Sequence, residues 1–134
     1  MSDLYPFENH FLELNGLQYH YLDEGRGDPV IMVHGNPSWS FYYRDLVKAL
    51  RTRYRVIAPD HIGSGLSEKP GDGDYSDTLK QRVDHLEALL EHLQIRERIT
   101  LALVEVMVLE AIQFEKIIVK RVEIAHGCIT INYG

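Results

Sequence analysis

Apolar and polar residues alternate over residues 11–23, and this alternation predicts a β-hairpin. Apolar side chains recur at every second position after Asn15 and Gly16, with further apolar residues before them. An Asn-Gly pair between two alternating runs is the strongest short-range signal for a hairpin with a two-residue turn. A polar, glycine-containing loop follows the second run.

Three later segments, 30–33, 54–58 and 99–103, are short and mostly apolar. Such runs are typical of strands that are buried on both faces. Between them, residues 38–50 and 78–93 have apolar positions at helical spacing, and Ser38 or Ser40 is a candidate N-cap of the first helix. The apolar positions are Tyr43, Leu46, Val47 and Leu50 in the first predicted helix, and Val83, Leu86, Leu89, Leu90 and Leu93 in the second. Strand, helix, strand, helix, strand is the pattern of a parallel sheet covered by helices, and therefore of an α/β fold.

The pattern of apolar and polar residues changes after residue 103. Residues 104–116 fit a helix, and residues 117–124 and 128–133 alternate like two strands joined by a turn at 125–127. We therefore expect a first region, 1–103, and a tail, 104–134, that packs on the same domain.

Composition excludes several classes of function. The chain has 134 residues, a length that suits one domain, and a formal net charge of −6, which argues against a nucleic-acid partner. The basic run 51–55 fits a solvated helix end. Cys128 is the only cysteine, so no internal disulfide is expected. No signal peptide and no membrane-spanning run is visible, which predicts a cytoplasmic location.

Two motifs carry a family resemblance. The first is His-Gly-Asn-Pro-Ser-Trp-Ser-Phe at 34–41, and the second is Ala-Pro-Asp-His-Ile-Gly-Ser-Gly-Leu-Ser at 58–67. Together with Arg-Val-Asp-His-Leu-Glu-Ala-Leu-Leu at 82–90, they resemble the haloalkane-dehalogenase branch of the α/β-hydrolase superfamily. Within this branch the chain is most similar to the β-lactone decarboxylases of olefin biosynthesis. The resemblance covers about residues 10–103, the N-terminal part of such an enzyme.

The resemblance implies an oxyanion site at Gly35, Asn36 and Pro37. In the family the backbone amide that matches Asn36 forms half of the oxyanion hole, and the asparagine side chain helps to hold the departing halide. The alternative is a strand-to-helix turn that needs glycine and proline for its shape alone. The glycines after Asp60 do not have the spacing of a nucleotide-binding loop, and in the family this stretch is structural.

The family's nucleophile is an aspartate on a sharp elbow after the third buried strand, followed by tryptophan and glycines. Here Glu105 falls on that position, but Val106, Met107 and Val108 follow it. A β-branched residue does not readily adopt the strained elbow geometry, so Glu105 fits a solvated helix residue better than a nucleophile.

The histidines do not supply the rest of the family's machinery. The catalytic histidine and acid of the family lie far downstream, and His126 alone follows the break, in a predicted turn. No histidine pair has the spacing of a metal site, so we expect no metal and no cofactor. We expect surface positions for five of the histidines, which are His10, His20, His61, His85 and His92.

The resemblance implies covalent hydrolysis of a small apolar substrate, such as a haloalkane or a β-lactone. We expect this chain to be catalytically incomplete. A non-catalytic binding or oligomerising module is the alternative. The tail has three explanations: an interrupted gene, a chimera, or a natural small protein whose tail completes the sheet. Self-association is expected unless the tail packs back onto the sheet, because three parallel strands would otherwise expose apolar edges.

Overall fold

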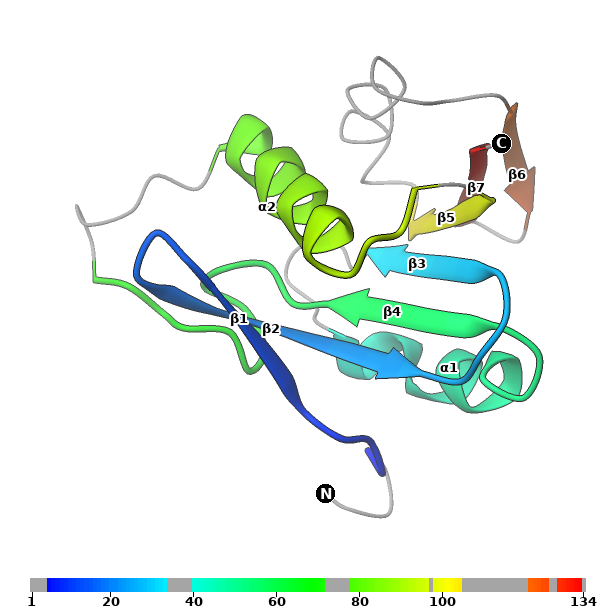
Figure 1. The fold of residues 1–134 in the computed structure, drawn as a ribbon, viewed down its shortest axis with the longest axis horizontal. Coiled ribbons are helices and arrows are strands. Elements are labelled where there is room, and N and C mark those ends of the chain that lie inside the picture. The colour runs from blue at the N-terminus through cyan, green and yellow to red at the C-terminus, as the bar shows by residue number, and fades with distance from the viewer. Residues whose placement is uncertain are drawn as a thin grey trace.

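A computed structural model describes residues 5–33, 40–71, 78–96, 98–104, 121–125 and 128–133 of the chain. The described strands form one seven-stranded sheet with the order β1-β2-β4-β3-β5-β7-β6 (Figure 1). The elements in chain order are β1 (His10–Leu14), β2 (Leu17–Glu24), β3 (Pro29–Val33), the 3-10 helix η1 (Ser40–Tyr43), α1 (Arg44–Leu50), β4 (Arg55–Pro59), α2 (Leu79–His92), β5 (Ile99–Val104), β6 (Arg121–Ala125) and β7 (Cys128–Tyr133).

The predicted hairpin is confirmed. β1 and β2 pair antiparallel with Leu14 opposite Leu17, so Asn15 and Gly16 form the whole turn. Both turn residues have positive φ, 51° and 84°, as a type I′ turn requires, and asparagine and glycine are the residues that tolerate this conformation.

The predicted parallel core is confirmed as well. β3 lies between β4 and β5 and is parallel to both. Successive residues of a strand point to opposite faces, so each apolar run supplies two cores. In β3, Ile31 and Val33 pack on the α2 side, whereas Val30 and Met32 pack on the α1 side. The two helices therefore cover opposite faces of the sheet (Figure 1).

The two helices differ in how well the sequence predicted them. All five predicted apolar positions of α2 pack into one core, and Thr78 caps the helix in a reciprocal capping box with Gln81. At the other end Gln94, with a φ of 57°, begins the exit from the helix, and the Ile95 N–H donates to the Leu90 carbonyl over 2.9 Å. These are the marks of a Schellman cap, which usually has glycine at the position of Gln94.

The first helix is shorter than predicted. Residues 40–43 form the 3-10 turn η1, and α1 begins only at Arg44 with no side-chain cap. The expectation that Leu46 is buried is wrong, since 41% of its surface is exposed, and Ser40 is not an N-cap. A long-range partner, Asp60, holds the Ser40 N–H instead.

The tail joins the main sheet. β7 pairs antiparallel with β5 over six residues, from Ile99 opposite Tyr133 to Val104 opposite Cys128, and β6 pairs with the far side of β7. The predicted second hairpin is therefore present, with its first strand at Arg121–Ala125. The helix expected over 104–116 lies outside the described residues, apart from Val104, which ends β5. The boundary at residue 103 stays a prediction.

Candidate functional site

The carboxyl ends of β4, β3 and β5 lie side by side, because the three strands are adjacent and parallel. They form the carboxyl edge of the parallel part of the sheet. This edge is where open α/β sheets bind their ligands. Asp60 directly follows β4, and Glu105 directly follows β5. Gly35, Asn36 and Pro37 begin two residues after β3. The predicted site residues Gly35, Asn36, Pro37 and Glu105 lie outside the described residues, so their roles stay predictions.

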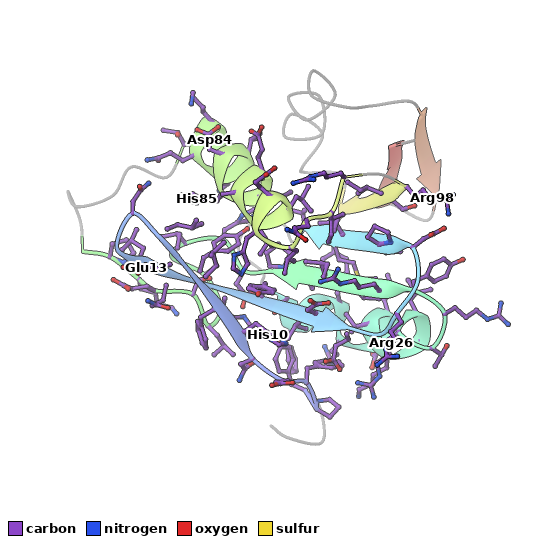
Figure 2. All side chains as sticks on the ribbon, in the orientation of Figure 1. His10, Glu13, Arg26, Asp84, His85 and Arg98 are labelled. Atoms are coloured by element: carbon purple, nitrogen blue, oxygen red, sulfur yellow. The ribbon has the colours of Figure 1, made fainter. Side chains whose placement is uncertain are left out.

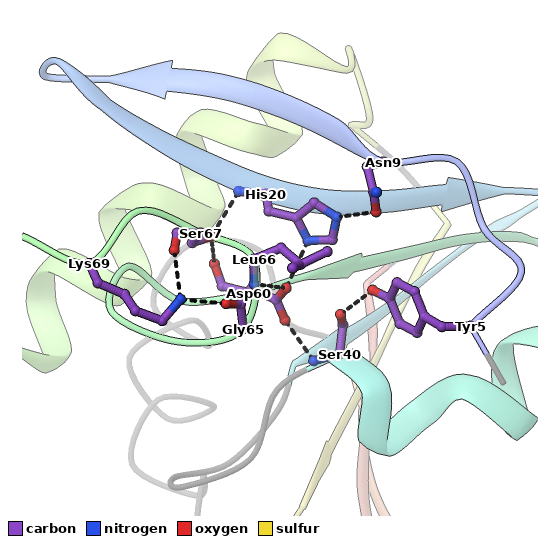
Figure 3. A network of polar contacts seen from close by, with 9 residues as sticks. All are labelled: Tyr5, Asn9, His20, Ser40, Asp60, Gly65, Leu66, Ser67 and Lys69. Atoms are coloured by element: carbon purple, nitrogen blue, oxygen red, sulfur yellow. Dashed lines mark hydrogen bonds and ion pairs between the residues drawn. The ribbon is translucent and has the colours of Figure 1, made fainter. Parts of the chain in front are cut away.

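Asp60 organises the described part of this edge, as Figure 3 shows. Its carboxylate is completely buried and accepts three hydrogen bonds. The backbone N–H of Ser40 donates to Oδ1 over 2.6 Å, while Oδ2 accepts from the backbone N–H of Leu66 over 3.1 Å and from Nδ1 of His20 over 2.7 Å. A buried carboxylate is stable only when it is paired and hydrogen-bonded, and this one is. Its position therefore supports a structural role rather than attack on a substrate.

The surface position expected for His20 is wrong. The imidazole is fully buried between Asp60 and Asn9, whose Oδ1 lies 2.9 Å from Nε2 of the ring. Because the carboxylate can only accept, Nδ1 of His20 is the donor toward Asp60. The pair joins two residues that are 40 positions apart in the chain.

Two other histidines are also buried, against expectation. His61 is 2% exposed and His85 is 8% exposed. His85 packs edge-on against the ring of Tyr19, with the ring centres 5.8 Å apart. His92 is exposed and His10 is half-buried, so the expectation is confirmed only for His92. His85 is buried because it lies on the same face of α2 as Leu89, and His61 is buried in the loop between Asp60 and Ile62.

The loop after β4 folds around the Asp60 carboxylate. Gly65 has a φ of 55°, and a Cβ atom at this position would lie 2.5 Å from the carboxylate carbon of Asp60. The Ser67 hydroxyl donates to the Asp60 carbonyl over 2.6 Å and accepts from the His20 backbone N–H over 2.8 Å. The glycine is therefore required by close approach, and the serine fastens the loop to β2.

Two tyrosines anchor the start of the first helix. The Tyr5 hydroxyl lies 2.5 Å from Oγ of Ser40, and burial together with the nearby Asp60 charge raises the pKa of Tyr5, although the bond to Ser40 opposes the shift. The Tyr43 hydroxyl donates to the carbonyl of Val33, the last residue of β3, over 2.7 Å. The chain is thus held on both sides of residues 34–39, at Val33 and at Ser40.

Sequence reasoning found Asp60 as a structural residue but missed its buried partner. The available signal was the alternation in β2, since Tyr19 and Tyr21 face the α2 core and His20 must then face the opposite, equally buried side. In the part of the chain that the structure describes, no three His, Cys, Asp or Glu side chains are grouped to hold a metal ion. No described helix is long and apolar enough to cross a membrane.

Comparison with known proteins identifies the class to which this fold belongs. A family model described as "alpha/beta hydrolase fold" matches residues 28–103, more than half of the chain. The chain therefore belongs to the α/β-hydrolase fold family.

The similar proteins come from the branch that the motifs indicated. The chain is 59% identical over 101 residues to a cis-3-alkyl-4-alkyloxetan-2-one decarboxylase of Shewanella oneidensis, with 75% of this chain and 32% of that protein covered. It is 47% identical over 88 residues to haloalkane dehalogenase 2 of Mycobacterium tuberculosis, with 62% and 31% covered. A solved haloalkane dehalogenase from Agrobacterium tumefaciens matches with a TM-score of 0.72 and 28% identity, over 86% of this chain and 38% of that one. The chain is a haloalkane dehalogenase-like member of the family that spans about a third of the length of these relatives.

Proposed function

We propose that this chain carries the oxyanion half of a dehalogenase-like or β-lactone-decarboxylase-like site and does not by itself complete the reaction. The observation that carries the proposal is the point at which the family match ends. That match stops at residue 103, one residue before the end of β5. The nucleophile elbow of the family follows this strand.

The oxyanion half is supported by the anchors around it. Asn36 lies between Val33, whose carbonyl accepts from Tyr43, and Ser40, whose N–H donates to Asp60. An oxyanion hole works only when its donors are held in position before the substrate arrives. We therefore assign the oxyanion amide to Asn36, with Gly35 and Pro37 shaping the turn.

The residues after β5 support the proposal that the nucleophile half of the site is missing. Val106 stands where the family has tryptophan, and Met107 and Val108 stand where it has glycines. Because the residues of the elbow are missing, we do not expect Glu105 to attack carbon and form an ester. His126 is the only histidine after β5 in this sequence, and it does not match the family's pattern, in which the base lies far downstream.

Turnover of a brominated alkane tests this proposal. A pH indicator reports the proton that hydrolysis releases, and the folded chain should release none above the rate without protein. Glu105→Gln is the matched control, because it removes the residue that counting from the third buried strand places at the family's nucleophile position. Proton release by the chain that exceeds release by Glu105→Gln would overturn the proposal. A β-lactone, followed by loss of carbon dioxide, provides the second substrate arm.

A non-catalytic binding or oligomerising module is the second candidate. The observation that favours it is the tail, which continues the sheet beyond β5 through β7 and β6 rather than leaving the edge of β5 open. β1 and β6 then form the two outer edges of the described sheet, where a strand of a binding partner can add. A constant mass of one chain in light scattering at rising concentration would count against self-association.

The origin of the tail can be tested on the encoding DNA from about codon 95 onward. A second reading frame that restores His-Asp-Trp-Gly-Gly would identify an interrupted gene, with no selected role for the hairpin. The absence of such a frame would favour a chimera or a selected tail. The cytoplasmic location and the small apolar substrate stay predictions of the sequence and the family.

A further inference from the structure

A polar pocket lies at the opposite end of the sheet from Asp60, where β3 and β4 begin. It has a volume of about 260 Å³, and its charged and polar walls include Asp28, Arg55, Gln94, Arg96 and Arg98. Figure 2 shows Arg98 on the side of the molecule from which β3 and β4 start. Because the strands are parallel, the pocket lies one strand length away from the carboxyl ends of the same strands.

The charge of the pocket opposes that of the chain. Three arginines and one carboxylate are among its described lining residues, although the whole chain has a formal net charge of −6. Arginines gathered against the overall charge, in a concave site, mark a position where a negative ligand is favoured.

The three arginines differ in how firmly they are held. Arg55 donates two hydrogen bonds to the Asp23 carboxylate, from Nε over 2.9 Å and from Nη2 over 2.7 Å. These bonds raise the pKa of Arg55. Arg96 makes only a long contact of 3.5 Å with Glu91, and both side chains are well exposed. Such an exposed pair is weak, so Arg96 can turn toward a ligand at little cost.

The backbone of Arg98 also points to this site. Gln94 and Arg98 both have positive φ, 57° and 56°. The conformation of Gln94 is explained by the helix cap, but that of Arg98 belongs to no helix end or hairpin turn among the described residues. A non-glycine residue in this region is strained, and such strain gathers at ligand sites.

We propose that this pocket binds a small oxyanion of at least two charges, such as phosphate, with Arg96 and Arg98 as its partners, since the guanidinium of Arg55 already binds Asp23. Guanidinium groups bind such oxygens in a forked geometry. The volume lies just below that of drug-sized ligand sites, which is ample for a phosphate group or a short dicarboxylate. The site is separate from the proposed oxyanion hole, and its test does not depend on catalysis.

Calorimetric titration of the full chain with inorganic phosphate, at constant ionic strength set with chloride, tests the proposal. Saturable binding at one site is expected, with affinity that falls as salt rises. Arg96→Gln and Arg98→Gln should each weaken binding about tenfold, because each removes a charge-assisted hydrogen bond. Lys80→Gln is the matched control, since it removes the same charge from an exposed position near the start of α2, at the far end of that helix from Gln94.

Two results would overturn the proposal. One is the absence of saturable binding at millimolar phosphate, and the other is an equal loss of affinity in Lys80→Gln, which would show a general charge effect. A competition arm with succinate then defines the ligand. Displacement of phosphate by succinate extends the site to dicarboxylates, whereas no displacement restricts it to tetrahedral oxyanions.

Discussion

Asp60 and His20 show how much one buried, hydrogen-bonded pair can organise. The Asp60 carboxylate joins β2 through His20, the loop after β4 through Leu66, and the start of η1 through Ser40. All three donors are N–H groups that would be left without a partner if the carboxylate were removed. Such pairs contribute little against an apolar replacement of the whole pair, but breaking one partner leaves a buried polar group unsatisfied.

Replacement of Asp60 by asparagine should therefore destabilise the chain strongly. One oxygen acceptor becomes an NH₂ donor that faces N–H groups, and we expect the free energy of unfolding to fall by about 3 kcal/mol. Urea denaturation measures the change. Asp84→Asn, at an exposed carboxylate on α2, removes the same charge and should leave stability nearly unchanged. Equal losses in the two variants would contradict the role given to Asp60.

Tyr5 predicts a pH dependence of stability. Its pKa is raised in the folded chain, mainly because burial disfavours the phenolate. Above about pH 10 the unfolded phenol ionises while the folded one stays neutral, so the free energy of unfolding falls as the pH rises. In Tyr5→Phe this alkaline loss should be smaller, although the variant starts about 1 kcal/mol lower through its lost hydrogen bond. Urea denaturation at about pH 8 and about pH 10.5 measures both effects.

Tyr54→Phe is the control for this measurement. Tyr54 is 38% exposed, so Tyr54→Phe removes a tyrosine hydroxyl from the surface and should leave the alkaline loss of stability as large as in the unmodified chain. An alkaline loss that is the same in Tyr5→Phe and in the unmodified chain would refute the assignment.

Among the elements, α2 is specified by its own sequence, whereas the first helix depends on its surroundings. Thr78 and Gln81 form the N-terminal cap within four residues, and the apolar face of α2 follows helical spacing throughout. The first helix has no such local cap, and its start is fixed by Asp60 and Tyr5. Local signals therefore place α2, and tertiary contacts place η1 and α1.

Gln94→Gly should stabilise the chain by about 0.5–1 kcal/mol. Gln94 has the left-handed conformation of a helix C-cap, where a side chain is strained and glycine is not. The relief of strain exceeds the entropy that glycine adds to the unfolded state. Thermal unfolding measures the gain. Gln94→Ala keeps the strain and should show no gain, so a matching rise in both variants would contradict the explanation.

A pair of leucines tests the two helix faces. Leu89 of α2 is fully buried, whereas Leu46 of α1 is 41% exposed, although the sequence pattern predicted both as buried. Leu89→Ala should lower the free energy of unfolding by about 2–5 kcal/mol through lost burial and a cavity. Leu46→Ala should change it by less than about 1 kcal/mol. Similar losses of the free energy of unfolding in the two variants, measured by urea denaturation, would support the sequence-based prediction that Leu46 is buried.

At the scale of the whole molecule, the tail changes what the sheet presents to solvent. β7 pairs along the full length of β5, so the apolar parallel core is flanked by β2 on one side and by β7 on the other. Lys, Glu and other charges at an outer strand discourage further pairing, and β6 carries Arg121 and Glu123. The sequence predicted self-association only for a tail that leaves the sheet uncovered. The tail pairs with the sheet, so this condition is not met.

Disruption of β7 should bring self-association back. Thr130 lies in the middle of β7, opposite Ala102 on one side and Glu123 on the other. Thr130→Pro removes a backbone N–H from this central strand, and a proline is tolerated only at edges. Light scattering should then give a mass that rises with concentration. Thr130→Ser keeps the backbone donor and should behave like the unmodified chain, and identical masses for both variants would refute the covering role of β7.

The sequence determined the hairpin, the three parallel strands, the helix α2 and the family of the chain, because each depends on neighbouring residues: alternation, continuous apolar runs, a turn dipeptide and two motifs. The tertiary structure decided the burial of His20, the true partner of Ser40 and the pairing of β7 with β5. These depend on residues dozens of positions apart, such as His20 and Asp60, and burial of a polar ring is decided by whether a distant partner satisfies it. Periodicity cannot report such a partner, since it records only which face a residue occupies.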